Sequence, residues 1–145
     1  MSLNAPKWIF TAASLICIAL FSSAASAALT PKLQEIAKNG KHIFTHPTFG
    51  GNGKSCESCH SGGGLEIGHL PNGKEVPSLR NAAAIFPRFN RRDQLVTLQD
   101  QIRNCVGGAI EGTPPAYDSE EMRTLVVYLT SLSQGKAIDM GGKPQ

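Results

Sequence analysis

The residues with the most distinctive spacing are two cysteines and a histidine, in the run Cys56-Glu57-Ser58-Cys59-His60. Thiols three positions apart lie on one face of a helical turn, where both can reach the vinyl groups on one edge of a porphyrin. The histidine that follows directly can then point its imidazole at the iron. The spacing therefore predicts that Cys56, Cys59 and His60 hold one covalently attached haem c, with His60 as an axial ligand.

Two other kinds of site use similar cysteine spacing. A zinc site needs four ligands, usually from a second CxxC or HxxxH cluster. The sequence contains no second CxxC, and its His42-x-x-x-His46 pair lies at the end of the expected first helix, where a favourable interaction with the helix dipole explains it. A thioredoxin-type redox pair needs a βαβ context, which the residues flanking Cys56 do not provide. The pattern therefore favours haem attachment over both alternatives.

Residues 1–27 have the composition of a secretory signal peptide. Lys7 supplies a positive charge, residues 8–21 are mostly apolar, and Ala25-Ser26-Ala27 fits a cleavage site for signal peptidase. The apolar run is short for a bilayer span, so we expect cleavage rather than a retained anchor. The sequence therefore predicts a periplasmic protein without stable membrane insertion after cleavage.

Residues 28–145 are short enough to form one small domain, which holds a single haem motif. The formal net charge of the whole chain is +3, and no basic stripe or aromatic platform stands out. This composition argues against nucleic acid as a partner. The segment from about residue 136 onward is expected to form a loose tail.

Hydrophobic spacing predicts helices and no strands. The first helix begins after Thr30 and ends before Pro47, and Gly40 inside it would let another helix cross closely. The other expected helices are a short segment at residues 78–84, a helix that Thr97 caps and Gly107-Gly108 close, and a last helix that opens with a capping box at residues 118–121 and ends at Gly135. We therefore expect an all-α, small cytochrome c-like fold of four to five short helices around one covalently attached haem.

The residue on the other side of the iron decides the chemistry of a haem, because methionine raises its potential and thiolate lowers it. Cys105 is the odd thiol of residues 28–145 once Cys56 and Cys59 carry the haem, and an unpaired thiol in an oxidising compartment needs an explanation. Its place on an apolar helix face beside two glycines favours ligation to iron, while burial as a small hydrophobic residue is the alternative. Met122 and His69 are the other candidate ligands.

Two further residues are candidates for contacts with the haem or its histidine. Pro71 stands about a dozen residues after His60, a position similar to that of the proline whose carbonyl binds the second ring nitrogen of the haem histidine in class I cytochromes c. Arg80 could pair with a haem propionate.

A basic cluster follows, formed by Arg88, Arg91 and Arg92. These side chains could attract an anionic substrate, or they could belong to a solvated loop whose charge Asp93 partly offsets.

Several residues beyond the haem motif match one known family. They are Phe86-Pro87-Arg88-Phe89, Leu98-x-x-x-Ile102-x-x-Cys105, Ser119-x-Glu121-Met122, Leu125 and Tyr128-Leu129. From about Gly40 to Gly135 the chain resembles the haem domain of the Sox-type thiosulfate-oxidising cytochrome subunits and the thiosulfate dehydrogenases. The resemblance implies that Cys105 is the distal haem ligand and that sulfur chemistry takes place at the haem. Those proteins are longer and generally carry a second haem domain or a degenerate one.

The main functional interpretation is a periplasmic monohaem c-type cytochrome that transfers single electrons between transiently bound redox proteins. The alternative is a haem-thiolate enzyme or subunit that oxidises thiosulfate or related sulfur anions. A permanently bound, non-catalytic subunit of a dehydrogenase is a third hypothesis. No residue is assigned a catalytic role on the sequence alone.

Overall fold

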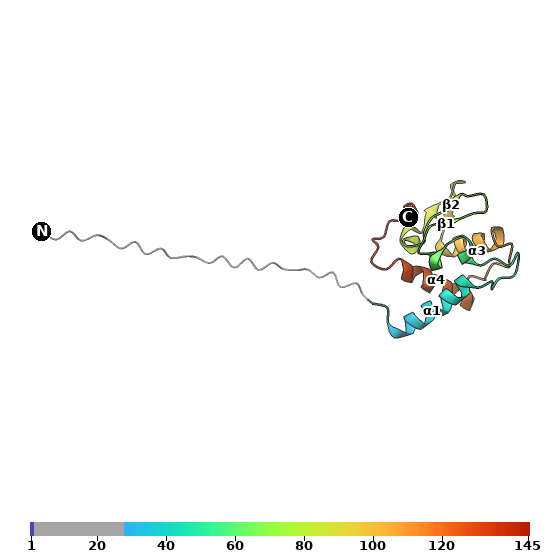
Figure 1. Ribbon diagram of the computed structural model, residues 1–145, viewed down its shortest axis with the longest axis horizontal. Helices are drawn as coiled ribbons and strands as arrows, with labels where there is room; N and C mark the ends of the chain where they lie inside the picture. The colour runs from blue at the N-terminus through green and yellow to red at the C-terminus, as the bar shows by residue number, and fades with distance from the viewer. Residues whose placement is uncertain (2–27) are drawn as a thin grey trace.

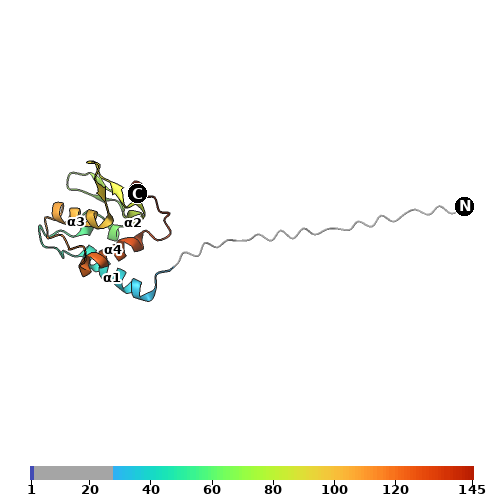
Figure 2. The same cartoon turned by 180° about the vertical axis from the view of Figure 1, so that it is seen from behind.

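The structure is a computed structural model that describes residue 1 and residues 28–145. The expected signal peptide therefore lies outside the described residues. The elements in chain order are α1 Pro31–Thr45, η1 Cys56–Ser58, η2 Gly62–Gly64, β1 Gly68–His69, β2 Glu75–Val76, α2 Ala82–Ile85, β3 Arg88–Phe89, β4 Leu95–Val96, α3 Leu98–Gly108 and α4 Glu120–Leu132. Figure 1 shows α1 at one end of the domain, the β1–β2 hairpin at the opposite end, and α4 and α3 between them; Figure 2 shows the domain from behind. None of the helices among the described residues is both long enough and apolar enough to cross a membrane.

Helix α1 begins where the sequence predicts and packs closely against α4. The Thr30 side chain caps it by accepting a hydrogen bond from the Leu33 N–H, and Pro31 occupies the first helical position. At Gly40, a Cβ would overlap the backbone oxygen of Thr124 and lie 2.6 Å from the Cβ of Tyr128. The absence of a side chain at Gly40 therefore permits the close helix crossing that the sequence predicts.

The hydrophobic core lies between α1, α3 and α4. Its cluster of buried residues consists of Phe44, Ile102, Met122, Leu125, Tyr128 and Leu129. The Phe44 and Tyr128 rings meet edge to face, with their centroids 5.4 Å apart, a favourable geometry for aromatic pairs. These contacts hold the first and last helices together below the segment that carries the haem motif.

The expectation that the chain contains no strand is wrong. Strands β1 and β2 pair antiparallel, with Gly68 opposite Val76, and β3 pairs with β4, with Arg88 opposite Val96. Each strand has only two residues, so no alternating pattern long enough to indicate a strand can develop in the sequence. The fold is therefore mostly helical, with two small hairpins.

The ends of the other helices differ slightly from the expectation. Helix α2 is displaced toward Ile85 relative to the predicted segment 78–84, and α3 continues through both glycines to Gly108. Helix α4 begins at Glu120, and the Ser119 hydroxyl caps it by accepting from the Met122 N–H at 3.2 Å. Helix ends are set by such local hydrogen bonds, which hydrophobic spacing does not reveal.

The segment after residue 135, expected to be loose, is hydrogen-bonded to α2. The backbone N–H of Asp139 donates to the Ala84 carbonyl at 2.8 Å, and that of Gly141 donates to the Ile85 carbonyl at 3.0 Å. The Asn81 side-chain amide, in turn, donates to the Lys143 carbonyl at 2.9 Å. The bonds from Asp139 and Gly141 satisfy carbonyl groups at the end of a very short helix, which has no following turn to pair with them.

Candidate functional site

The haem motif forms a single tight turn, η1. The Ser55 N–H donates to the Ser58 hydroxyl at 3.0 Å, and the His60 N–H donates to the Cys56 carbonyl at 3.0 Å. This turn places Cys56 and His60 in the wall of one pocket. The local sequence therefore folds as the attachment motif requires.

Two hydrogen bonds to Gly63 fix the glycine-rich loop that follows. The Gly63 N–H donates to a Glu57 carboxylate oxygen at 2.9 Å, while the buried Tyr128 hydroxyl donates to the Gly63 carbonyl at 2.6 Å. Gly63 has a positive φ of 65°, a conformation that glycine adopts without strain. Helix α4 thus holds the loop in place next to the haem motif.

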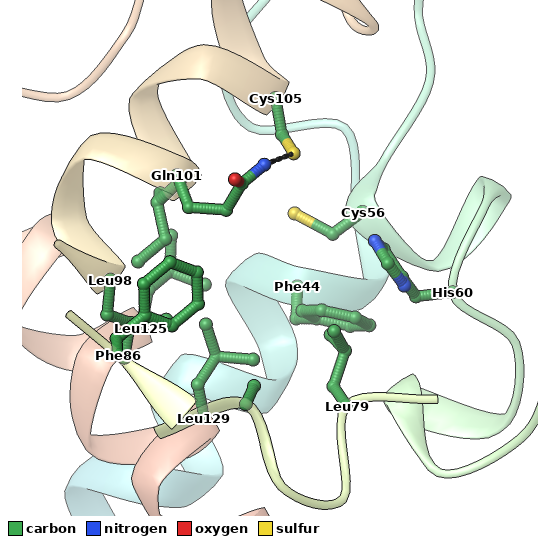
Figure 3. Close-up of a pocket in the computed structure, with 12 residues that line it drawn as sticks. Phe44, Cys56, His60, Leu79, Phe86, Leu98, Gln101, Cys105, Leu125 and Leu129 are labelled. Carbon is green, nitrogen blue, oxygen red and sulfur yellow. Dashed lines mark hydrogen bonds between the residues drawn. The ribbon is translucent and has the colours of Figure 1, made fainter. Parts of the chain in front are cut away.

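The pocket lies between η1, α3 and α4. Ligand pockets are typically lined mainly by apolar side chains. The apolar side chains that line this one include Phe44, Leu79, Phe86, Leu98, Leu125 and Leu129 (Figure 3). This lining suits a hydrophobic group.

Four polar side chains interrupt this apolar lining: Cys56, His60, Gln101 and Cys105. Figure 3 shows the sulfur atoms of Cys56 and Cys105 pointing into the space between α3 and the segment that carries His60. Burial, helped by Cys105, raises the pKa of the Cys56 thiol to about 12, and burial also raises the pKa of the Cys105 thiol. Both thiols are therefore neutral at pH 7 until a bond to haem or a metal removes the proton.

The His60 ring is prepared for ligation through its second nitrogen. Burial lowers its pKa, and its Nδ1 lies 3.2 Å from the carbonyl oxygen of Pro77. A ring that donates from Nδ1 keeps the lone pair of Nε2 free for a metal, and the bond to the carbonyl fixes the ring orientation.

The carbonyl oxygen that accepts a hydrogen bond from the His60 ring belongs to Pro77, whereas the sequence predicted Pro71. Pro71 lies in the turn of the β1–β2 hairpin and is exposed. Pro77 follows β2, where the hairpin brings the chain back toward His60. The predicted spacing of about a dozen residues assumed a chain without a hairpin. Because the β1–β2 hairpin intervenes, the carbonyl that reaches His60 lies six positions later in the sequence.

Among the candidates for the sixth iron ligand, the structure brings only Cys105 into the pocket with His60. The Met122 side chain is 1% exposed and belongs to the core cluster beneath the pocket. His69 is exposed in β1. Arg80, considered for a propionate, is also exposed and donates from Nε to the Leu65 carbonyl at 2.8 Å.

The residues present fit a covalently attached haem. The pocket has an almost entirely apolar lining, the Cys56 thiol of the attachment motif lies in its wall, and an imidazole with an available nitrogen forms another part of that wall. A sulfur from α3 faces the same space. This is the donor set that haem proteins use, combining an imidazole with a second axial ligand.

Comparison with known families assigns the chain to one of them. The family model described as "SoxA/TsdA, cytochrome c domain" matches residues 39–138, which is more than half of the chain. This chain belongs to that family. SoxA/TsdA cytochrome c domains bind covalently attached haem c, so the predicted cofactor is confirmed at the level of the family.

The relatives with known functions act on sulfur compounds. This SoxA/TsdA domain is 31% identical over 90 residues to the thiosulfate dehydrogenase of Allochromatium vinosum, covering 61% of this chain and 32% of that protein. It is 30% identical over 107 residues to the enzyme of Stutzerimonas stutzeri, covering 70% and 33%. It is 28% identical over 105 residues to the L-cysteine S-thiosulfotransferase subunit SoxA of Hydrogenobacter thermophilus, covering 72% and 36%. The chain spans about a third of the length of these relatives.

Solved structures confirm the fold of this SoxA/TsdA domain. SoxXA from P. pantotrophus superposes with a TM-score of 0.60 at 20% identity, covering 76% of this chain and 37% of the matched chain. Thiosulfate dehydrogenase (TsdBA) from Marichromatium purpuratum gives 0.62 at 18% identity, covering 82% and 26%. The cytochrome c-like fold is therefore confirmed, with the two hairpins as the departure from an all-α chain.

The sequence did not identify Gln101 and Arg88 as two residues that act on the Cys105 sulfur. Gln101 donates a hydrogen bond from Nε2 to the Cys105 sulfur at 3.3 Å. The Arg88 guanidinium lies 4.9 Å from the centroid of the Phe86 ring, and its charge lowers the pKa of Cys105, opposing the larger effect of burial. The spacing of four between Gln101 and Cys105 could have indicated the first contact, whereas the second depends on how the β3–β4 hairpin folds back.

Proposed function

We propose that this domain oxidises thiosulfate or a related small sulfur anion in the periplasm. In this proposal Cys56 and Cys59 attach a single haem c, His60 ligates the iron, and Cys105 is the ligand from α3. The observation that carries the proposal is the position of the Cys105 sulfur, which faces the same pocket as His60 and Cys56. The sulfur-oxidising relatives support it, and they favour this function over a general electron carrier.

The position of Arg88 supports an anionic substrate. Its guanidinium is half-buried, stacks on Phe86 in the pocket wall and acts electrostatically on Cys105. A cation with reduced exposure to water attracts an anion more strongly than a fully solvated one does. Arg91 and Arg92, by contrast, are exposed in the hairpin turn and can contribute only to long-range attraction.

The electron balance of this oxidation requires a redox partner that takes up the electrons. When two thiosulfate anions join through their terminal sulfurs, one S–S bond forms and two electrons leave the pair. A haem held by Cys56, Cys59 and His60 would carry one electron at a time, so the two electrons would have to pass in turn to a second redox protein. Within the chain, Arg88 attracts the anions, Cys105 presents its sulfur to the pocket, and the apolar side chains exclude water from the reacting atoms.

The test is turnover by the purified, haem-loaded protein with thiosulfate and an artificial one-electron acceptor such as ferricyanide. We expect the wild-type protein to reduce the acceptor and Cys105→Ser to lose most of that activity. Ala109→Ser is the matched control, because it adds a hydroxyl at the exposed end of the same helix. Activity retained by Cys105→Ser, or no activity in the wild type, would contradict the proposal and return the domain to the role of a plain electron carrier.

A further inference from the structure

Helix α3 carries a polar contact to the Cys105 sulfur that the proposed function does not use. The amide Nε2 of Gln101 lies 3.3 Å from Cys105 Sγ, and Figure 3 shows this side chain reaching along the helix to the sulfur. Residues four positions apart lie on the same helix face, so the contact is built into α3 itself. Both side chains are half-buried and line the pocket.

The surroundings of this contact are mostly apolar. Phe86, Leu98 and Ile102 line the same pocket, and the groups that act on Cys105 electrostatically are Cys59 and Arg88. A hydrogen bond to a negatively charged sulfur is about twice as strong as one between neutral groups. An amide provides this bond without adding a charge of its own.

We propose that Gln101 is a positioning residue that holds the Cys105 sulfur toward the pocket and withdraws electron density from it through an N–H···S hydrogen bond. This inference rests on the proposed ligation of iron by Cys105. Hydrogen bonds to a ligand are one of the means by which a protein sets the reduction potential of its metal. A sulfur that donates less electron density stabilises the oxidised iron less, so the hydrogen bond raises the potential.

The test compares two substitutions at Gln101 with one control in the haem-loaded protein. Gln101→Met keeps the length and removes the donor, whereas Gln101→Glu places an ionised acceptor beside the sulfur. Gln99→Met makes the same change on the same helix at a residue that does not line the pocket. For each protein, the reduction potential and the electron paramagnetic resonance spectrum of the oxidised state are measured.

We expect Gln101→Met to lower the potential, with a change of up to about tenfold in the equilibrium between the oxidation states, equal to about 59 mV for one electron. Gln101→Glu should lower the potential further, and Gln99→Met should leave it at the wild-type value. Altered g-values in both Gln101 variants, absent from Gln99→Met, would accompany the shift and exclude a general loss of stability as its cause.

Cys105→Ser, recorded alongside, separates the two proposals. If this variant loses a thiolate-type low-spin signal while both Gln101 variants keep the wild-type potential and spectrum, the inference about Gln101 is overturned and the ligation by Cys105 stands. If Cys105→Ser leaves the spectrum unchanged, the sulfur is not on the iron, and the ligation and the inference fail together.

Discussion

Gly40 of α1 lies directly against the backbone carbonyl of Thr124 in α4. A Cβ at this position would overlap that oxygen and lie 2.6 Å from the Tyr128 Cβ. Figure 2 shows the two helices crossing on the side of the domain away from the hairpins. Because Tyr128 also bonds to the loop after the haem motif, this crossing determines how α4 supports the site.

Gly40→Ala should therefore destabilise the protein. The added methyl group meets backbone rather than a flexible side chain, so α1 and α4 must separate, at a cost of about 1–3 kcal/mol. Gly108→Ala is the control, because a Cβ at the end of α3 meets nothing within 4 Å. That substitution should be neutral or stabilising by up to about 1 kcal/mol. Denaturant unfolding of the haem-loaded proteins measures both, and equal stabilities would contradict the packing at Gly40.

Tyr128→Phe should destabilise the protein through the loop at Gly63. The substitution removes the buried hydroxyl that donates to the Gly63 carbonyl at 2.6 Å but keeps the ring against Phe44. Leaving a buried acceptor without its donor costs about 1–3 kcal/mol. Tyr117→Phe removes a hydroxyl that donates to the Asp100 carboxylate, and this solvent-exposed bond should contribute less to stability than the buried one. Thermal unfolding of the two variants distinguishes them, and an equal loss would contradict the role of the buried bond.

The Asp100 carboxylate makes the free energy of unfolding depend on pH in the acidic range. Hydrogen bonds from Tyr117 and then from Thr97 lower its pKa from 3.8 to about 2. Because the pKa is lower in the folded state, this stabilisation is complete above about pH 4 and is lost as the pH falls toward 2. Thermal unfolding of the wild type and Asp100→Asn between pH 2 and 6 measures the effect. Their difference in stability should shrink below pH 4, and a constant difference would contradict the assignment.

If the proposed oxidation of sulfur anions holds, Arg88→Met should weaken the binding of the anionic substrate. The variant keeps an apolar chain over Phe86 but removes the cation that acts on Cys105. We expect the KM for thiosulfate to rise about tenfold, equivalent to roughly 1.4 kcal/mol. Arg92→Met removes a charge from the exposed hairpin turn and should have a much smaller effect that salt screens. Steady-state kinetics at two ionic strengths separates the two variants, and equal effects would assign the attraction to overall charge.

Pro71→Ala should leave the haem spectrum and the reduction potential unchanged. Pro71 is exposed in a hairpin turn, while the carbonyl that contacts His60 Nδ1 belongs to Pro77. The bond that orients the imidazole is therefore unaffected by the substitution. Absorption spectra and a redox titration provide the check. A shifted potential would indicate that Pro71, and not Pro77, contacts the haem histidine.

The sequence alone identified the residues whose meaning depends on short spacing. The run from Cys56 to His60 indicated haem attachment because the motif requires only one helical turn. Gly40 inside α1 and Thr30 as its N-cap were placed correctly because helix capping and close crossing depend on local residue types. The match to the SoxA/TsdA family was likewise visible in the residues from Phe86 to Leu129, and the family comparison confirmed it.

Only the tertiary structure decided the contacts between distant segments. Pro77, rather than Pro71, reaches His60 because a hairpin of two-residue strands returns the chain at that point, and such strands leave no hydrophobic period. Cys105 enters the pocket while Met122 fills the core, although both lie on apolar helix faces. Hydrophobic spacing shows that a face is buried, but the packing of α3 and α4 determines which buried residue faces the haem pocket.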